Sequence, residues 1–546
     1  MLDNARQYQA DWRDSNNQNF EYYDGNQWTA AELAELKERG QQDTVLNIVR
    51  PTVDMMFAQY LERQADITLM GREVSDDGLG KIMTHMLKWL LDMADFDYYE
   101  GEVFMEGAVG GIGWFGVDVE EDEFGDDQIQ VEQVPWEEMF WDPHARRPDF
   151  QDARYIHRVG WMDIDDVEEL WDVEISHEDA TAGWDDYTGQ EAKAQEGSDP
   201  IEGGDHKPRR VPVIETWYKN SKKKLHQVIW TGNTFLVGGL EDSENENPHK
   251  ADGDGIDLSL YPFIPFRFAR DKEGLPQGVV GWMKPEQDSL NHLHSKWQWG
   301  ISSRQIVAED NAVEDIETLR EEINKPDGIM LVGPGALADK RFQILDNLKD
   351  SQHLMQMMQF MIVMGQRVSG VNDATMGIGG VNSRSNQQEQ TRIVQGAQMQ
   401  ARALTNLMLA KRQVARVALR MAAIHLKTPR ISRVMEPNGD EQVTPLNQPF
   451  AAEDPETGES IEMQYNIADA MRYDVIMKTV PAFDSVRQQQ MLLVTEAAKS
   501  GVIPPPIASR LIIELSNFHD KEKILQSLEQ FEKQQAEALT NAGAPQ

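Results

Sequence analysis

The chain of 546 residues contains no cysteine. This absence excludes disulfide bonds, thiol nucleophiles and zinc sites with cysteine ligands, and it fits assembly in a reducing cytosol. Hydrophobic residues make up 40% of the chain, yet no apolar run approaches the roughly 20 residues that span a bilayer. The N-terminal sequence lacks the apolar core of a signal peptide. We therefore expect a globular protein of about two to four domains with no membrane partner.

Positive charge is also scarce in this sequence. Lysine and arginine total 52 against 93 aspartate and glutamate residues, which gives a formal net charge of -41 at pH 7. Such a surface repels phosphate and should not bind DNA tightly. Two interpretations stay open: the charge serves solubility, or it forms a surface that lies close to a polyanion without binding it.

The usual catalytic motifs are absent as well. The sequence has no Walker-type GxxxxGKS or GxxxxGKT motif, no HExxH and no GxSxG. Residues 111–116 match the dinucleotide-binding glycine pattern, but the expected order of helix, glycines and strand is the reverse of what that site needs. Residues 252–257 look like the start of a calcium loop, but Asp257 stands at the sixth position, where that loop needs glycine, and no glutamate follows at the twelfth. His292 and His294 point to different sides of a helix. We expect no catalytic residue, no cofactor and no metal site, and therefore no enzyme.

Hydrophobic periodicity predicts a mixture of helices and strands. The spacing predicts one helix over residues 78–104, ended by glycines, and then a hairpin with strands near residues 114–119 and 129–131. Longer helices are expected at 285–303, 351–369 and 387–427. A β-rich stretch should follow to about residue 480, with a helical tail from residue 485.

Methionines crowd the expected helix at 351–369. They are Met355, Met357, Met358, Met361 and Met364. Ordinary core packing is one interpretation. The other is a helix that repacks or slides against its neighbours, because methionine is an adaptable apolar side chain.

A basic segment interrupts the acidic chain. Residues 390–435 contain nine lysines and arginines and no acid. Arg412, Arg416 and Arg420 are four residues apart and therefore share one face of a helix. We interpret them as candidates for a subunit interface, in which they bind an acidic surface of the same or a neighbouring subunit. Nucleic-acid binding is the second interpretation.

Between these two helices, residues 371–390 form a nearly neutral segment rich in glycine, asparagine and serine. Arg384 is its only cation. An ordinary surface connector is one interpretation of such a composition.

Several segments, in their order along the chain, resemble the portal (head-to-tail connector) proteins of short-tailed, double-stranded DNA bacteriophages. The motifs that carry the resemblance are Phe20–Trp28, Asn47–Pro51, Tyr261–Asp271, Gly274–Gly278, Pro285–Asn291 and the run from Ser369 to Gln390. Larger members of that family carry a long C-terminal helical barrel, whereas this chain has only a short helical tail.

The resemblance implies a portal-like α+β fold with an α/β wing, two long channel-lining stem helices, a small α/β clip and a short helical C-terminal crown. The implied segments are the wing at 1–284, stem helices at 285–303 and 351–370, the clip at 304–350, a tunnel loop at 371–390, the long basic helix and second part of the wing at 391–482, and the crown at 483–546.

It also implies a function. Portal proteins form a ring, typically of twelve subunits, at one capsid vertex of the virion, and they assemble in the host cytoplasm. Double-stranded DNA passes through the channel during packaging and ejection, and the expected protein partners are the terminase large subunit, the tail adaptor, the capsid and the scaffolding protein. Neutral side chains offer weak, sequence-independent contacts to phosphate. The expected DNA-contact residues are Asn372, Thr375, Asn382, Ser383, Arg384, Ser385 and Asn386.

Two alternatives stay open at this point. One is another virion structural protein, such as a tail adaptor or scaffold, although an adaptor would lack the paired long helices. The other is a metal-dependent nuclease, which would need a defined set of carboxylates and a basic DNA groove.

Overall fold

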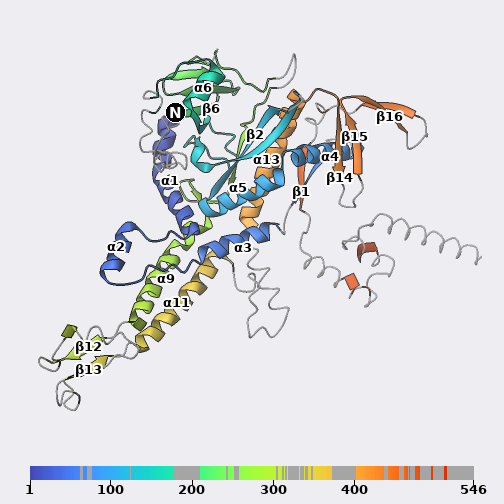
Figure 1. Cartoon of the computed structure of the whole chain (residues 1–546). Helices are drawn as coiled ribbons and strands as arrows, with labels where there is room; N and C mark the ends of the chain where they lie inside the picture. The colour runs from blue at the N-terminus through green and yellow to red at the C-terminus, as the bar shows by residue number, and fades with distance from the viewer. Residues whose placement is uncertain are drawn as a thin grey trace, which may run out of the picture.

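The computed structural model shows a mixed α and β body from which a pair of helices projects (Figure 1). The structure describes mainly residues 1–61, 65–70, 77–122, 125–177, 210–241, 244–250, 257–302, 305–309, 342–345, 348–371, 401–435, 441–453, 460–464 and 474–479. The α+β class predicted from the sequence is confirmed.

The centre of the body is a three-stranded antiparallel sheet in the order β3-β2-β9. Its strands are β2 (Ile112–Glu121), β3 (Asp127–Val134) and β9 (Phe263–Arg267). The predicted hairpin is β2 and β3, paired from Trp114 with Val134 to Glu121 with Asp127.

Alternation along β2 separates two cores, because successive side chains point to opposite faces of a sheet. Phe115 and Val117 join a large cluster that includes α5 (Phe96–Gly110) and α13 (Ala401–His425). Trp114 joins an aromatic cluster with Trp136, Trp141 and Phe150 on the other face. The sheet thereby fixes the helices on one side and the second, five-stranded sheet on the other.

The five-stranded sheet is antiparallel, in the order β4-β5-β6-β7-β8. Its strands are β4 (Met139–Trp141), β5 (Tyr155–Asp163), β6 (Arg210–Lys219), β7 (Leu225–Thr231) and β8 (Thr234–Val237). The 3₁₀ turn Trp136–Glu138 precedes β4, and α6 (Ile164–Trp171) follows β5.

The remaining strands form pairs. Strands β1 (Ala65–Met70) and β18 (Asp474–Thr479) pair antiparallel and join distant parts of the sequence. The other pairs are β10 (Ala269–Arg270) with β11 (Pro276–Gln277), β12 (Gln305–Ala308) with β13 (Phe342–Leu345), β14 (Arg430–Met435) with β15 (Glu441–Leu446), and β16 (Pro449–Glu453) with β17 (Ser460–Gln464).

The single helix predicted over residues 78–104 is wrong, because the chain turns in its middle. It forms α4 (Asp77–Met93) and α5, and Asp95 between them adopts a left-handed conformation with φ of 47°. The turn lets Phe96 stack on Phe115 of the sheet, with ring centroids 5.6 Å apart. Burial of an aromatic ring offsets the backbone strain at Asp95.

Two long helices, α9 (Val279–Ser302) and α11 (Leu348–Ser369), pack against each other and project from the body (Figure 1). They correspond to the helices predicted at 285–303 and 351–369. Helix α9 begins at Val279 rather than at Pro285, because buried Val279 and Val280 anchor its first turn in the core. Strands β12 and β13 lie at the far end of the pair.

Three other helices surround the base of this pair. Helix α1 (Leu2–Asp24) lies along the body, and α3 (Val49–Leu61) packs on α5 and α9. Helix α2 (Ala30–Glu38) stands beside α9 and begins with a capping box formed by Thr29 and Glu32. None of the helices in the described ranges is long and apolar enough to cross a membrane.

The helix predicted over residues 387–427 appears as α13, which ends at His425. Residues 387–400 lie outside the described part of the chain, as do the tail from residue 513 and most positions between 480 and 512.

Candidate functional site

The first candidate feature is a ladder of amide and hydroxyl side chains on α9 that holds an extended segment of residues 41–48, called the strap. Gln287 accepts a hydrogen bond from the backbone N–H of Ile48 at 3.0 Å and donates one to the carbonyl of Leu46 at 2.9 Å. Asn291 accepts the N–H of Leu46 at 3.1 Å. One turn further, Ser295 donates to the carbonyl of Gln42 at 2.7 Å. The strap is thereby fixed to α9 through side chains.

The ladder also reaches α1 and α2. The amide of Asn291 donates to Gln27 at 2.6 Å, in the turn between these helices. Next to it, Trp28 packs edge-on against His292, and the His292 imidazole lies 3.6 Å from the Glu32 carboxylate. Gln287 and Asn291 are fully buried, and buried polar groups are stable only when they are hydrogen-bonded. Hydrogen bonds and ring contacts therefore join α9 to the strap and to the turn between α1 and α2.

The methionines of α11 divide between the two interpretations drawn from the sequence. Met358 is 8% exposed and belongs to the packed side of the helix. Met355 and Met357 are 50% and 39% exposed, and Phe360 on the same helix is 56% exposed. Core packing therefore explains Met358, but it does not explain Met355 and Met357.

The outward side of α13 carries a stripe of residues at helical spacing, in which residues seven apart lie nearly above one another. Leu409 is 40% exposed in the middle of it, and Arg402 and Arg416 are exposed on either side. The stripe consists of Arg402, Asn406, Leu409, Gln413, Arg416 and Arg420, with Arg412 at its edge.

The predicted interface residues Arg412, Arg416 and Arg420 thus lie together on α13. Arg420 donates a hydrogen bond to the hydroxyl of Ser259 at 3.2 Å, and its pKa is lowered by partial burial and by nearby Arg416. The buried Nε of Arg412 has no hydrogen-bond partner. Within the described ranges, none of the three forms an ion pair with a carboxylate. Their role between subunits stays a prediction.

Among the described residues, it is Lys411 of α13, and not one of these arginines, that forms an ion pair with an acid of the same chain. Lys411 Nζ lies 2.7 Å from a Glu100 carboxylate oxygen on α5, with the two side chains 8% and 4% exposed. The Lys411 ammonium also lies 5.1 Å from the ring centroid of Phe96. Burial raises the pKa of Glu100, against the lowering effect of Lys411. Sequence spacing singled out the neighbouring arginines and missed this lysine.

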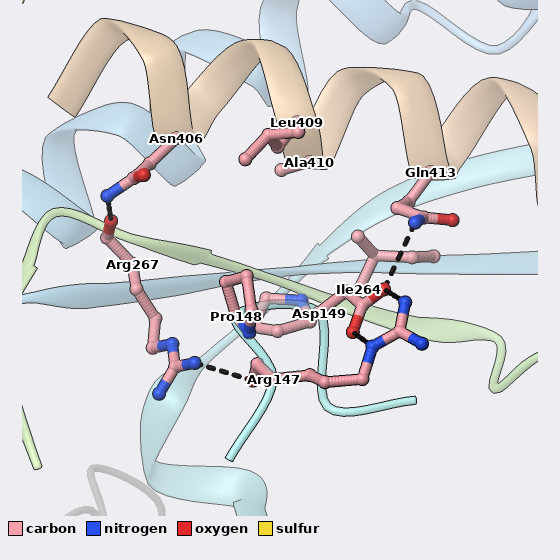
Figure 2. Close-up of a pocket in the computed structure, with 10 residues that line it drawn as sticks. Arg147, Pro148, Asp149, Ile264, Arg267, Asn406, Leu409, Ala410 and Gln413 are labelled. Carbon is pink, nitrogen blue, oxygen red and sulfur yellow. Dashed lines mark hydrogen bonds and ion pairs between the residues drawn. The ribbon is translucent and has the colours of Figure 1, made fainter. Parts of the chain in front are cut away.

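A cleft of about 190 Å³ opens beside the α13 stripe (Figure 2). Leu409 and Ala410 project toward it from the helix, and Pro148, Ile264 and Pro265 line its other walls. Its polar residues pair largely with one another. The Arg147 guanidinium binds Asp149 at 2.9 and 2.6 Å, Gln413 donates to Asp149 at 3.2 Å, Asn406 donates to the carbonyl of Arg267 at 2.8 Å, and Arg267 donates to the carbonyl of Arg147 at 2.6 Å.

One cation of this cleft, Arg267, is desolvated. Burial lowers the pKa of Arg267 to about 10, with a further lowering from Arg270, and its guanidinium lies 4.5 Å from the ring centroid of Phe150. The cleft therefore combines apolar walls with the buried Arg267 and the Arg147–Asp149 ion pair.

The glycine pattern at residues 111–116 has a packing function. The order is helix α5, glycines and strand β2, as predicted. Gly111 has φ of 98°, and a Cβ there would lie 2.4 Å from the backbone nitrogen of Gln277. A Cβ on Gly113 would lie 2.3 Å from the carbonyl oxygen of Val103. These glycines allow α5, β2 and the β10–β11 turn to approach closely.

The other positions singled out from the sequence are the DNA-contact candidates, residues 252–257 and the two histidines of α9. The DNA-contact candidates from Asn372 to Asn386 lie outside the described residues, as do most of residues 252–257. His292 contacts Trp28, whereas His294 stacks on Trp297, so the two histidines do point apart. In the part of the chain that the structure describes, no group of three or more acidic or histidine side chains is arranged to hold a metal ion.

Comparison with known proteins shows which family this chain belongs to. The family model described as "Phage P22-like portal protein" matches residues 1–546, the whole chain. The chain belongs to this portal family. It is also 23% identical over 365 residues to the portal protein of Helicobacter pylori bacteriophage KHP30, a match that covers 67% of this chain. The matched region spans 55% of the relative's own length.

Membership of the portal family confirms the resemblance carried by the ordered motifs. Each motif alone is only moderately specific, and the resemblance rests on their order and spacing along the chain. The features that the motifs did not reveal are the Lys411–Glu100 pair and the strap. A signal for the strap existed, because Gln287, Asn291 and Ser295 repeat at four-residue spacing on one side of α9.

Proposed function

We propose that the protein is a phage portal, a ring at one capsid vertex through which double-stranded DNA is packaged and later ejected. The observation that carries the proposal is the match of the portal family model to residues 1–546. The formal net charge of -41 supports it, because an acidic channel protein lets DNA slide without holding it.

Within this proposal, α9 and α11 are the channel-lining stem helices. The β12–β13 end of the pair belongs to the clip, which would dock the terminase large subunit during packaging and the tail adaptor afterwards. Its support is the position of that end, at the tip of a projection and far from the body. The body forms the wing that contacts the capsid and, during assembly, the scaffolding protein.

The segment at 371–390 would act as the tunnel loop. It connects the end of α11 with the segment that leads into α13, and its neutral side chains would touch phosphate weakly. The Arg412, Arg416 and Arg420 face of α13 would bind an acidic surface of a neighbouring subunit. The protein would have no chemistry of its own, and nucleotide hydrolysis would belong to the terminase.

Imaging and a hydrolysis assay test the proposal. Negative-stain micrographs of the purified full chain should show rings with a central hole, with the twelve-fold symmetry typical of the family, and the rings should not hydrolyse ATP. A homogeneous monomer, or nucleotide hydrolysis that copurifies with the chain, would contradict it. Incubation with DNA and Mg²⁺ separates it from the nuclease alternative, which requires DNA cleavage.

A further inference from the structure

Two unlike exposed surfaces of this chain complement each other. The first, called the basic cleft, consists of the cleft beside α13, with Leu409 on the helix and Pro148 and Pro265 as the facing wall, and of four arginines of the same helix: Arg402, Arg412, Arg416 and Arg420. Leu409 is 40% exposed at its centre. An exposed apolar centre within a charged border is typical of a protein contact site.

The volume of the cleft restricts what it can accept. At about 190 Å³ it is smaller than the roughly 300–1,000 Å³ of small-molecule sites. Its polar residues Arg147, Asp149 and Gln413 already bond to one another, so they leave few directional groups for a small polar ligand. A single large side chain presented by a protein surface fits these limits.

The second surface, called the acidic corner, is the turn between α4 and α5. It consists of Asp92, Met93, Asp95, Asp97, Tyr98 and Glu102. Tyr98 is 66% exposed and Met93 is 51% exposed, although both are large side chains of a rigid helical corner. Partial burial raises the pKa of Asp92, the nearby Asp97 raises it further, and Lys88 offsets part of the effect.

We propose that the acidic corner of one copy docks into the basic cleft of the next copy, with Tyr98 as the apolar anchor beside Leu409 and with Asp97 opposite Arg416. This inference rests on the proposed ring and names the surfaces that build it. Tyrosine and arginine are both enriched among the hot-spot residues of protein interfaces.

Symmetry supports a second copy as the occupant. A ring of more than two subunits needs a heterologous interface, in which two different patches of each subunit meet in turn. The acidic corner and the basic cleft are two such unlike patches of opposite charge. The buried Lys411–Glu100 pair connects α13 to α5, and both helices pack into the same hydrophobic cluster, so the two patches belong to one packed body.

Another acidic surface with an exposed apolar residue exists on α6, where Leu170 is 64% exposed among Asp165, Asp166 and Glu169. We favour the corner because it presents an aromatic anchor together with a second large apolar side chain. Helix α6 therefore serves as the matched control surface.

The test uses charge exchange in the full chain, with assembly followed by analytical ultracentrifugation across protein concentration. Arg416→Glu and Asp97→Lys should each raise the concentration needed for half-assembly by about tenfold, because each breaks one charge pair at the interface. The double variant should return it close to the unmodified value. Glu169→Lys should change nothing and should not rescue Arg416→Glu. Circular dichroism confirms that each exposed substitution leaves the fold intact.

Disulfide trapping gives an independent measurement, because the chain has no cysteine of its own. Oxidised rings that carry Asp97→Cys with Arg416→Cys should run as a ladder of covalent multimers, and Glu169→Cys with Arg416→Cys should not. If rings form but the double charge variant is not rescued and the Asp97–Arg416 cysteine pair gives no ladder, this inference is wrong while the proposed ring stands. The same holds if Glu169→Lys rescues Arg416→Glu, or if the Glu169–Arg416 cysteine pair gives a ladder. If the unmodified chain forms no ring, the proposed function and this inference both fall.

Discussion

At the scale of single residues, the buried ion pair of Lys411 and Glu100 should contribute to the stability of the fold. Removing one partner of a buried ion pair leaves the other charge uncompensated, at a cost of about 3–5 kcal/mol. We expect Lys411→Met to reduce the free energy of unfolding by this amount, measured by chemical denaturation. The double variant Lys411→Met with Glu100→Gln should recover most of this stability.

The matched control is Lys296→Met on α9, where the lysine is exposed and the effect should stay within about 0.5 kcal/mol. Equal effects for both lysines would show that the Lys411–Glu100 pair contributes no specific stability.

Glu106 on α5 makes the folded state sensitive to pH. One carboxylate oxygen accepts the backbone N–H of Trp136 at 3.0 Å, the other has no hydrogen-bond partner, and burial raises the pKa well above the ordinary value of 4.5. The unfolded chain then releases a proton that the folded chain keeps. Stability from this group is therefore present below pH 4.5 and is lost as pH rises toward the folded pKa.

We expect Glu106→Gln to flatten this decline, because the amide keeps the acceptor oxygen and does not ionise. The decline is measured as the thermal unfolding midpoint of the parent chain and of the Glu106→Gln variant between pH 5 and pH 8. The midpoint of the parent chain should fall more steeply with pH than that of the variant, and parallel curves would contradict the assignment.

At the scale of elements, the strap depends on side chains of one helix. Asn291→Ala would remove the acceptor of the Leu46 N–H and the donor to the Gln27 side-chain oxygen, at about 1–3 kcal/mol for a buried polar group left unsatisfied. We expect hydrogen exchange of residues 41–48 to accelerate, while exchange in the β2–β3 hairpin stays unchanged. Ser289→Ala is the control, because that hydroxyl bonds only to the carbonyl of Pro285 on its own helix.

Acceleration over the whole chain in Asn291→Ala would mean that the residue supports global stability rather than the strap. Equal exchange of the strap in the two variants would show that the ladder does not hold it.

Elements with strong local periodicity could be predicted from the sequence, whereas features that depend on contacts between residues far apart in the chain could not. The α9 and α11 helices and the β2–β3 hairpin follow from apolar spacing alone. The left-handed turn at Asp95 could not be predicted, because it exists to stack Phe96 on Phe115, a residue of a strand. Likewise, the local sequence does not distinguish Lys411 from the neighbouring arginines, because its partner Glu100 lies 311 residues earlier in the chain.

At the scale of the whole molecule, the ends of α11 and α13 define how the segment between them can be altered. Helix α11 ends at Ser369, Gly370 follows with φ of 76°, and Val371 is fully buried in the core. On the other side, Leu404 and Leu407 pack α13 into the same cluster. Both anchors lie outside residues 377–382, so a deletion there leaves the core packing of these anchors in place.

We therefore expect deletion of Gly377 to Asn382 to leave ring assembly intact and to impair packaging or retention of DNA. Its contacts to phosphate would be weak and shared among neutral side chains, so Arg384→Ala alone should have a milder effect than the deletion. Rings are counted by electron microscopy, and packaged genomes by nuclease-protected DNA per particle. Normal DNA content and normal infectious yield with the deletion would contradict the tunnel-loop assignment while leaving the ring unaffected. Absence of the rings themselves would instead show that this segment is part of the subunit interface.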